Sequence, residues 1–391
     1  MLFQSFISNR TKNFWVFQET TNLNFFALSI ISIFIPILML KLGFSLFEVI
    51  LFNLVLHFFD VIFNFVARKI LFKFGLKSDF IIGTFFIILF FIGYSFLDDF
   101  KNIYFLLLLG FFWAIYDSFY YVGFYYALIA NTKKIENINE NNILSNIFST
   151  IVSFLGPLLG SGIILYFKNK LILVYVVIGF LFLSLIPLLK YNVLEKNSKN
   201  IKIRFKRNFR NIKNFLIWSS LSIFRFLEYT IFPIYIYFHF SNINSVAWLG
   251  IISAFSSITA IYFSGIIEGE NREKSIMIGA GFLALIWFVR IFYPFDYILY
   301  LTSLVGPILL TFIYIPLDNS IQEQAKIEKN ELNIGFLKNL TSMFAKFLFI
   351  LIWLLSFKYL KLEEYFYFGI GLGILIILVN WFYLNYKNKM K

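Results

Sequence analysis

Long apolar stretches separated by short polar breaks run along almost the whole chain. Each stretch holds about 18 or more apolar residues, the length with which an α-helix crosses a ~30 Å hydrocarbon core. The stretches lack the period-two alternation of transmembrane β-strands, so helices are predicted. The twelve predicted spans are 24–42, 46–66, 79–97, 103–130, 143–166, 171–189, 214–240, 246–266, 276–293, 297–317, 334–357 and 366–385.

Composition agrees with this pattern. Of the 391 residues, 60% are hydrophobic and only 14% are charged, and the mean hydropathy is +0.80. A soluble chain of this length would need many more charged residues to cover its surface. The predicted fold class is therefore an all-α integral membrane protein.

Basic residues set the predicted orientation. If the N-terminus is inside, most of the 34 lysines and arginines fall in inner segments, as the positive-inside rule requires. Both termini are then cytoplasmic, in a multi-pass protein of the plasma or inner membrane. Segment 1–23 is mixed polar and aromatic and lacks the pattern of a cleaved secretory signal, so uncleaved insertion is expected.

The longest internal polar break, 190–213, is dense in lysine and arginine. We interpret it as a topology determinant that contacts anionic lipid head groups, and an RNA- or partner-binding loop is the alternative. No nucleic-acid partner is predicted for the protein as a whole. The absence of cysteine excludes disulfides, thiolate metal sites and iron–sulfur clusters, and two histidines are too few for a histidine metal cluster. No cofactor or metal is expected.

The basic break divides the spans six and six. "FIPILMLKLGFSLFEV" (34–49) is echoed by "IFPIYIYFHFSNINSV" (231–246), which aligns Pro36 with Pro233, and Gly83 aligns with Gly279 in the third span of each half. Such echoes are typical of duplicated transporter halves. The predicted organisation is an N-terminal segment 1–23, bundles 24–189 and 214–385, the linker 190–213 and a cytoplasmic tail 386–391.

With these features the chain resembles the major facilitator superfamily of secondary transporters. After span 2, "RKILFKFGLK" keeps Lys73, Gly75 and Lys77 of the family's loop motif, but Arg68 replaces its first glycine and Phe72 its aspartate. The resemblance makes Lys73 and Gly75 candidate gate residues, and the missing aspartate puts that gate in doubt.

Span 5 carries a second motif of the family. "GPLLGSG" keeps Gly156, Pro157 and Gly160 of the antiporter-associated pattern, with Ser161 in place of a glycine. Small residues let helices approach closely, and a proline bends a helix. The resemblance implies two six-helix bundles, related by a pseudo-twofold axis, around a central cavity.

Six charged residues lie away from the ends of the predicted spans, where each costs roughly 2.5–3.5 kcal/mol at a helix centre unless it faces a partner or a wet cavity. They are Asp60, Asp117, Arg225, Glu228, Lys338 and Lys346. The resemblance places Asp117, Arg225 and Glu228 in spans that line the central cavity. It places Asp60, Lys338 and Lys346 in spans that flank the contact between the halves, where pairs act as gates.

Helical spacing adds neighbours to these charges. Trp113 and Tyr120 share a face with Asp117, while Ser222, Tyr229 and Phe232 share one with Arg225 and Glu228. Further polar candidates are Ser29 and Ser32 in span 1 and Thr311, Tyr314 and Asp318 in span 10. His57 and His239 are interpreted as packing or interfacial groups.

We hypothesise that the protein is a secondary active transporter that moves a small solute by alternating access. Transport would be coupled to protons if an acidic residue is protonated when its ion pair with a basic residue breaks. For Arg225 and Glu228 the alternative is a permanent ion pair along one helix. Rival functions are a polysaccharide or lipid flippase-type exporter, a non-transporting sensor or scaffold, and a polytopic, glycosyltransferase-like enzyme. The enzyme would use acids of the short outer loops, Asp98 with Asp99 or Glu363 with Glu364, which we interpret as solvated turns.

Overall fold

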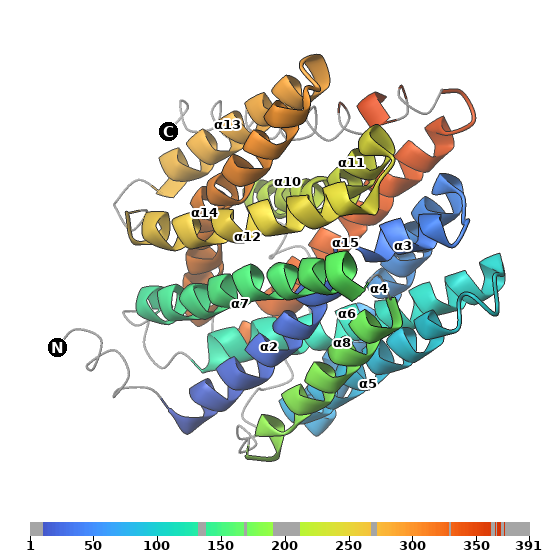
Figure 1. The fold of residues 1–391 in the computed structure, drawn as a ribbon. Helices are drawn as coiled ribbons and strands as arrows, with labels where there is room; N and C mark the ends of the chain where they lie inside the picture. Colours follow the sequence, from blue (N-terminus) through green and yellow to red (C-terminus); the bar gives the residue numbers. More distant parts are fainter. Residues whose placement is uncertain are drawn as a thin grey trace.

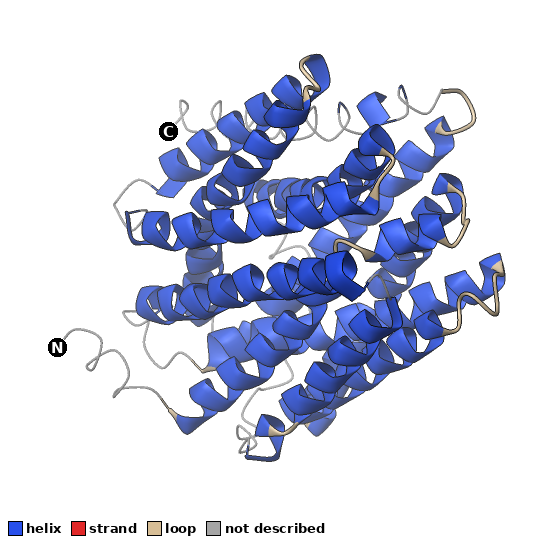
Figure 2. Ribbon diagram, in the orientation of Figure 1, coloured by secondary structure: helices blue, strands red, loops and turns tan. Residues whose placement is uncertain are grey.

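The computed structural model describes residues 11–131, 138–167, 170–190, 212–266, 272–327 and 330–360, together with 364, 366–368 and 371. In this part of the chain every regular element is a helix, and short loops join the helices (Figure 2). Nine of the described helices are long and apolar enough to cross a membrane.

The first half contains the helices of six predicted spans. Its elements are α2 (Lys12–Ile31), α3 (Ile35–Lys41), α4 (Leu46–Phe74), α5 (Leu76–Ser95), α6 (Ile103–Ala130), α7 (Ile138–Phe167), α8 (Lys170–Leu185) and the 3-10 turn η2 (Pro187–Lys190). The first helix begins at Lys12, well before the start predicted for span 1, because Thr11 caps it by accepting a hydrogen bond from the Phe14 N–H at 3.2 Å.

The second half repeats this series. Its elements are α10 (Ile212–Phe226), the π-helical turn η3 (Leu227–Ile231), α11 (Phe232–Phe240), α12 (Ile243–Ile266), α13 (Arg272–Phe292), α14 (Asp296–Ile327) and α15 (Glu331–Ser356). Most of the basic linker and, apart from 366–368 and 371, the predicted span 366–385 lie outside the described residues.

The helices form two groups that meet along a few helix pairs (Figure 1). In the first group α4, α5 and α6 pack together and α2 packs on α7 and α8. In the second, α14 packs on α12 and α13, and α10 packs on α15. The groups join where α7 lies beside α12 and where α15 lies against α4 and α6. Side chains on α4, α6, α7, α10, α12 and α15 therefore share the space between the halves.

The repeat predicted from sequence coincides with a shared structural detail. The first span of each half is interrupted, and its second piece begins with a proline at the second helical position, Pro36 in α3 and Pro233 in α11. A proline is tolerated in a first helical turn because its missing N–H has no partner there. Gly83 and Gly279 also correspond: a Cβ at Gly83 would lie 3.2 Å from the Tyr120 N atom of α6, and one at Gly279 would lie 3.1 Å from the Leu309 O atom of α14.

Small residues bring α7 close to α2. A Cβ added at Gly156 would overlap the side chain of Ser29, and one added at Gly160 would overlap the carbonyl of Ile30. Pro157 stands inside α7 between them. The span-5 motif is thus a packing surface for the first helix.

Candidate functional site

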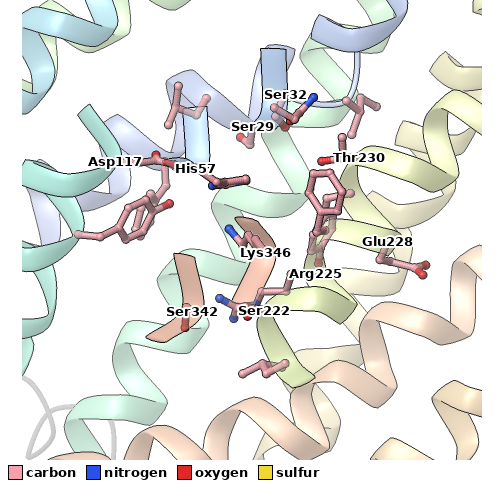
Figure 3. A pocket seen from close by; sticks show the side chains of 18 of the residues that line it. Ser29, Ser32, His57, Asp117, Ser222, Arg225, Glu228, Thr230, Ser342 and Lys346 are labelled. Carbon is pink, nitrogen blue, oxygen red and sulfur yellow. The ribbon is translucent and has the colours of Figure 1, made fainter. Parts of the chain in front are cut away.

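A cavity of about 520 Å³ lies between the two halves. Side chains from α2, α4, α6 and α7 line one side, and side chains from α10, η3, α11, α12, α14 and α15 line the other (Figure 3). The volume is within the roughly 300–1,000 Å³ typical of small-molecule sites. Its charged lining residues are Asp117, Arg225, Glu228, Lys338 and Lys346.

Most predicted site residues border this cavity. Besides the five charges, the predicted residues in the lining are Ser29, Ser32, Trp113, Pro157, Ser222, Tyr229 and Phe232. His57, which we interpreted from sequence as a packing or interfacial group, also lines the cavity. Other predicted residues lie elsewhere: Asp60, Tyr120, Thr311, Tyr314, Asp318, Gly156, Gly160, Lys73 and Gly75 are not among the lining residues.

Tyr120 lies in the interior of the first bundle and not at the cavity. Its ring packs against Phe80 and Tyr116, with centroids 5.0 and 5.1 Å away, and the residue is fully buried. Tyr121, the next residue of α6, lines the cavity instead. Three- and four-residue spacing correctly selects a face of the helix, but Tyr120 falls at the edge of that face and turns toward α5.

The ion pair of Arg225 and Glu228, the alternative interpretation of these two residues, does not form. Both carboxylate oxygens of Glu228 accept hydrogen bonds from Arg290 of α13, at 2.8 and 2.9 Å. Glu228 lies in η3, where the Phe232 N–H donates a hydrogen bond to the carbonyl of Leu227, five residues earlier. This bond makes the turn wider than that of an α-helix. This wider turn rotates Glu228 away from Arg225, and Figure 3 shows the two side chains pointing in different directions.

Arg290 was not identified from sequence as a site residue, because it lies close to the predicted end of its span. It is 1% exposed, its Nε donates to the Thr302 hydroxyl at 2.9 Å, and its guanidinium lies 3.7 Å from the centroid of the Phe232 ring. Gly306 leaves the space that this pair needs, since a Cβ there would lie 2.8 Å from Glu228 Oε1. The pair has the geometry of a structural link between η3 and α13.

Arg225 is the cation that faces the cavity from α10. Its guanidinium lies 4.3 Å from the ring centroid of Tyr314, and it forms no ion pair with the described residues. Lys338 of α15 pairs with Asp318 of α14 and lies 4.0 Å from the ring of Tyr125. Tyr314 and Asp318 of span 10 therefore do not line the cavity themselves, but they contact two cations that do, Arg225 and Lys338.

Two acids and a histidine gather in the first half of the protein, where His57 and Asp117 line the cavity and the fully buried Asp60 lies close to both. One ligand atom each of His57 and Asp60 on α4 and of Asp117 on α6 lies within 4.8 Å of the other two. Asp117 Oδ1 accepts a hydrogen bond from Trp113 Nε1 at 3.2 Å. Lys346 of α15 interacts electrostatically with Asp60 and Asp117 from the opposite half, and Figure 3 shows it beside His57. Sequence spacing could not show that α4 and α6 bring these groups together.

The remaining predicted residues lie away from the cavity. Lys73 is exposed, with its ammonium 5.0 Å from the Phe74 ring, and Gly75 joins α4 to α5 with a φ of 86°. Asp98 of the outer-loop pair forms an ion pair with Lys170 at 2.5 Å, and His239 lies 3.4 Å from Asp296. Glu363 lies outside the described residues.

The sequence model of the Major Facilitator Superfamily matches residues 20–350, so the chain belongs to this family. The structure is similar to the outward-facing crystal structure of a bacterial homologue of the iron transporter ferroportin, with a TM-score of 0.67 at 12% identity over 94% of this chain and 97% of that one. It is also similar to the human organic anion transporter MFSD10, with a TM-score of 0.63 at 13% identity over 94% and 99% of the two chains. Among curated protein sequences, none matches. Family and fold define a multi-pass membrane transporter and point away from an enzyme.

Proposed function

We propose that the protein is a secondary transporter that moves a small polar or amphipathic solute by alternating access. The observation that carries this proposal is the cavity of about 520 Å³, which both halves line with charges of both signs and with aromatic rings. A polysaccharide exporter would need a much larger hydrophilic space, so the cavity supports a small solute.

The contacts between the halves are of a kind that rocking can break. Where α4 ends and α15 begins, Asn339 donates to Asn64 at 2.8 Å and Arg68 donates to Asn333 at 2.8 Å. At the opposite ends of the helices, the Ser161 hydroxyl donates to the Ala247 carbonyl at 2.9 Å. Hydrogen bonds of this kind at both ends of a cavity suit a carrier whose halves move as rigid bodies.

The solute, the coupling ion and the orientation in the membrane are further parts of the hypothesis. At 12–13% identity the likeness to the bacterial ferroportin homologue and to the organic anion transporter supports the fold, and neither iron nor an organic anion is assigned to this chain as cargo. Proton coupling at Glu228 would require the carboxylate to release Arg290, its bidentate partner. Cytoplasmic termini and binding of anionic lipid by 190–213 stay predictions from the sequence.

Labelling of single cysteines tests alternating access, because the chain contains no cysteine. Ser222→Cys on α10 and Ser153→Cys on α7 place a thiol in the cavity wall, and Ala127→Cys is a buried control outside it. A membrane-impermeant thiol reagent should label both cavity positions from each side of the membrane and should leave the control unlabelled. Labelling from one side only, or from neither, would contradict the proposal.

A further inference from the structure

Three potential ligand atoms converge in the first half of the protein, next to the cavity. They belong to His57, Asp60 and Asp117 and all lie within 4.8 Å of one another. Metal–ligand bonds of about 2.0–2.2 Å place neighbouring ligand atoms roughly 3–3.5 Å apart, so small side-chain rotations would close the set around one ion. His57 and Asp60 share α4, and Asp117 comes from α6, which packs directly on it.

Two of these side chains have buried atoms with no hydrogen-bond partner. His57 is 5% exposed and its Nδ1 is unpartnered, and Asp60 is 0% exposed and its Oδ2 is unpartnered in the part of the chain that the structure describes. Buried polar atoms are rarely left without a partner, because the loss of hydration is not compensated. A cation between the three side chains would satisfy both atoms.

Both carboxylates of the cluster are held by hydrogen-bond donors. Asp60 Oδ1 accepts hydrogen bonds from the Ser118 hydroxyl at 2.6 Å and from Asn64 Nδ2 at 2.9 Å. Asp117 Oδ1 accepts from Trp113 Nε1 at 3.2 Å. Donors of this kind form the outer layer that orients carboxylate ligands in metal sites, and at Asp60 they leave Oδ2 unpartnered.

We propose that His57, Asp60 and Asp117 bind a divalent first-row metal ion such as Zn²⁺, Mn²⁺ or Co²⁺. An imidazole nitrogen combined with two carboxylate oxygens suits this class, whereas Na⁺, Mg²⁺ and Ca²⁺ prefer oxygen ligands alone. Two charges on the ion balance the two carboxylates. Because Asp117 borders the cavity, the site opens to the same space as the proposed solute path.

Lys346, on the other half of the protein, would compete with a bound metal ion for the negative charge of Asp60 and Asp117. Its ammonium is the cation of α15 that acts on Asp60 and Asp117, and it lies 3.6 Å from the sulfur of Met343. A bound divalent ion would replace Lys346 as the counter-charge and would repel it. Metal binding is therefore expected to weaken an attraction between the halves, which is the coupling that a carrier requires.

The two histidines offer a matched test in the full-length protein purified in detergent. Binding of Co²⁺ is measured by its visible absorption and of Zn²⁺ by calorimetry, without any assay of transport. The wild type should bind one ion, and His57→Gln should weaken binding at least about tenfold, because loss of even an outer-layer partner of a metal ligand costs about 10–100-fold in affinity. His239→Gln, which removes the other histidine, should leave the affinity unchanged.

Further variants separate the site from a folding defect. Asp60→Asn and Asp117→Asn should also lose affinity, and Lys346→Met should gain it, because the repulsion is removed while the length of the side chain is kept. Size-exclusion profiles and thermal unfolding show which variants are folded, and the gain in Lys346→Met cannot arise from misfolding. Absence of stoichiometric binding, equal losses in both histidine variants, or binding of Na⁺ alone would overturn the proposal. These outcomes concern binding and leave the labelling test of alternating access independent.

Discussion

Arg290 and Glu228 show how a membrane helix bundle can hold two charges away from water. The Arg290 guanidinium donates two hydrogen bonds to Glu228 and one to the Thr302 hydroxyl. It also lies over the rings of Phe232 and Trp287. A buried pair adds little net stability, because both groups have lost their hydration, but removal of one partner leaves the other uncompensated. Loss of one member of the pair is therefore expected to destabilise the protein more than loss of both.

Substitution of one partner should cost more stability than substitution of both. Arg290→Leu strands the Glu228 carboxylate and is expected to destabilise the protein by about 3–5 kcal/mol. The double variant Arg290→Leu/Glu228→Leu should recover most of this loss. Unfolding of the purified variants in detergent gives the comparison. If the two losses were simply additive, the charges would not act as a pair.

The same residues show why the site could be predicted only in part. The apolar surroundings of Asp117, Arg225 and Glu228 mark them as unusual, and all three border the cavity. Helical spacing correctly placed Trp113 beside Asp117, but Arg290 lies 62 residues from Glu228, and spacing carries no information on such distant contacts. The π-helical turn that rotates Glu228 also leaves no clear signal in a run of aromatic residues.

Among the elements, α7 depends on small residues on one face. Gly160 packs on the backbone of α2, whereas a Cβ at Gly162, on the exposed side of the same helix, would meet nothing within 4 Å. Alanine favours a helix over glycine by up to about 1 kcal/mol, so the two positions should respond to the same change in opposite ways.

Gly160→Ala should lower the yield of monodisperse protein, because its methyl group forces α7 away from Ile30. Gly162→Ala should keep the wild-type yield or exceed it slightly. Fluorescence-detected size exclusion of the two variants, expressed in parallel, measures the difference. Equal yields would show that α7 and α2 are not held at this distance.

Apolar length predicted most helices but missed the beginning of α2. The helix starts at Lys12, and its first turns bury Gln18, Thr20, Thr21 and Asn24 inside the protein. A search for apolar runs assumes that helices face lipid, so it overlooks a segment whose polar side chains face other helices. Amide and hydroxyl groups at such positions find partners, as Asn24 does when its Oδ1 accepts from the Tyr116 hydroxyl at 2.6 Å.

For the whole molecule, the two ends of the cavity determine which side is open. At the end where α4 meets α15, a chain of polar groups runs from Asn339 through Asn64 to Asp60 and Ser118. At the same end, Gln322 of α14 donates to Asn142 of α7 at 2.6 Å. Of these contacts, those between Asn339 and Asn64 and between Gln322 and Asn142 join the halves, and both would have to break if the cavity opened on this side.

Asn339→Ala should therefore shift the protein toward a state that is open at this end. One hydrogen bond contributes about 1 kcal/mol, which corresponds to roughly a fivefold change in the balance between two states. In the Ser222→Cys background, labelling from the side where α4 ends should become faster by about that factor, while labelling from the other side should slow or stay constant. Asn53→Ala is the matched control, because Asn53 also lines the cavity on α4 but donates to Val49 of its own helix. If both variants changed the labelling equally, the effect would lie in the cavity lining, and the contact between Asn339 and Asn64 would not hold this end closed.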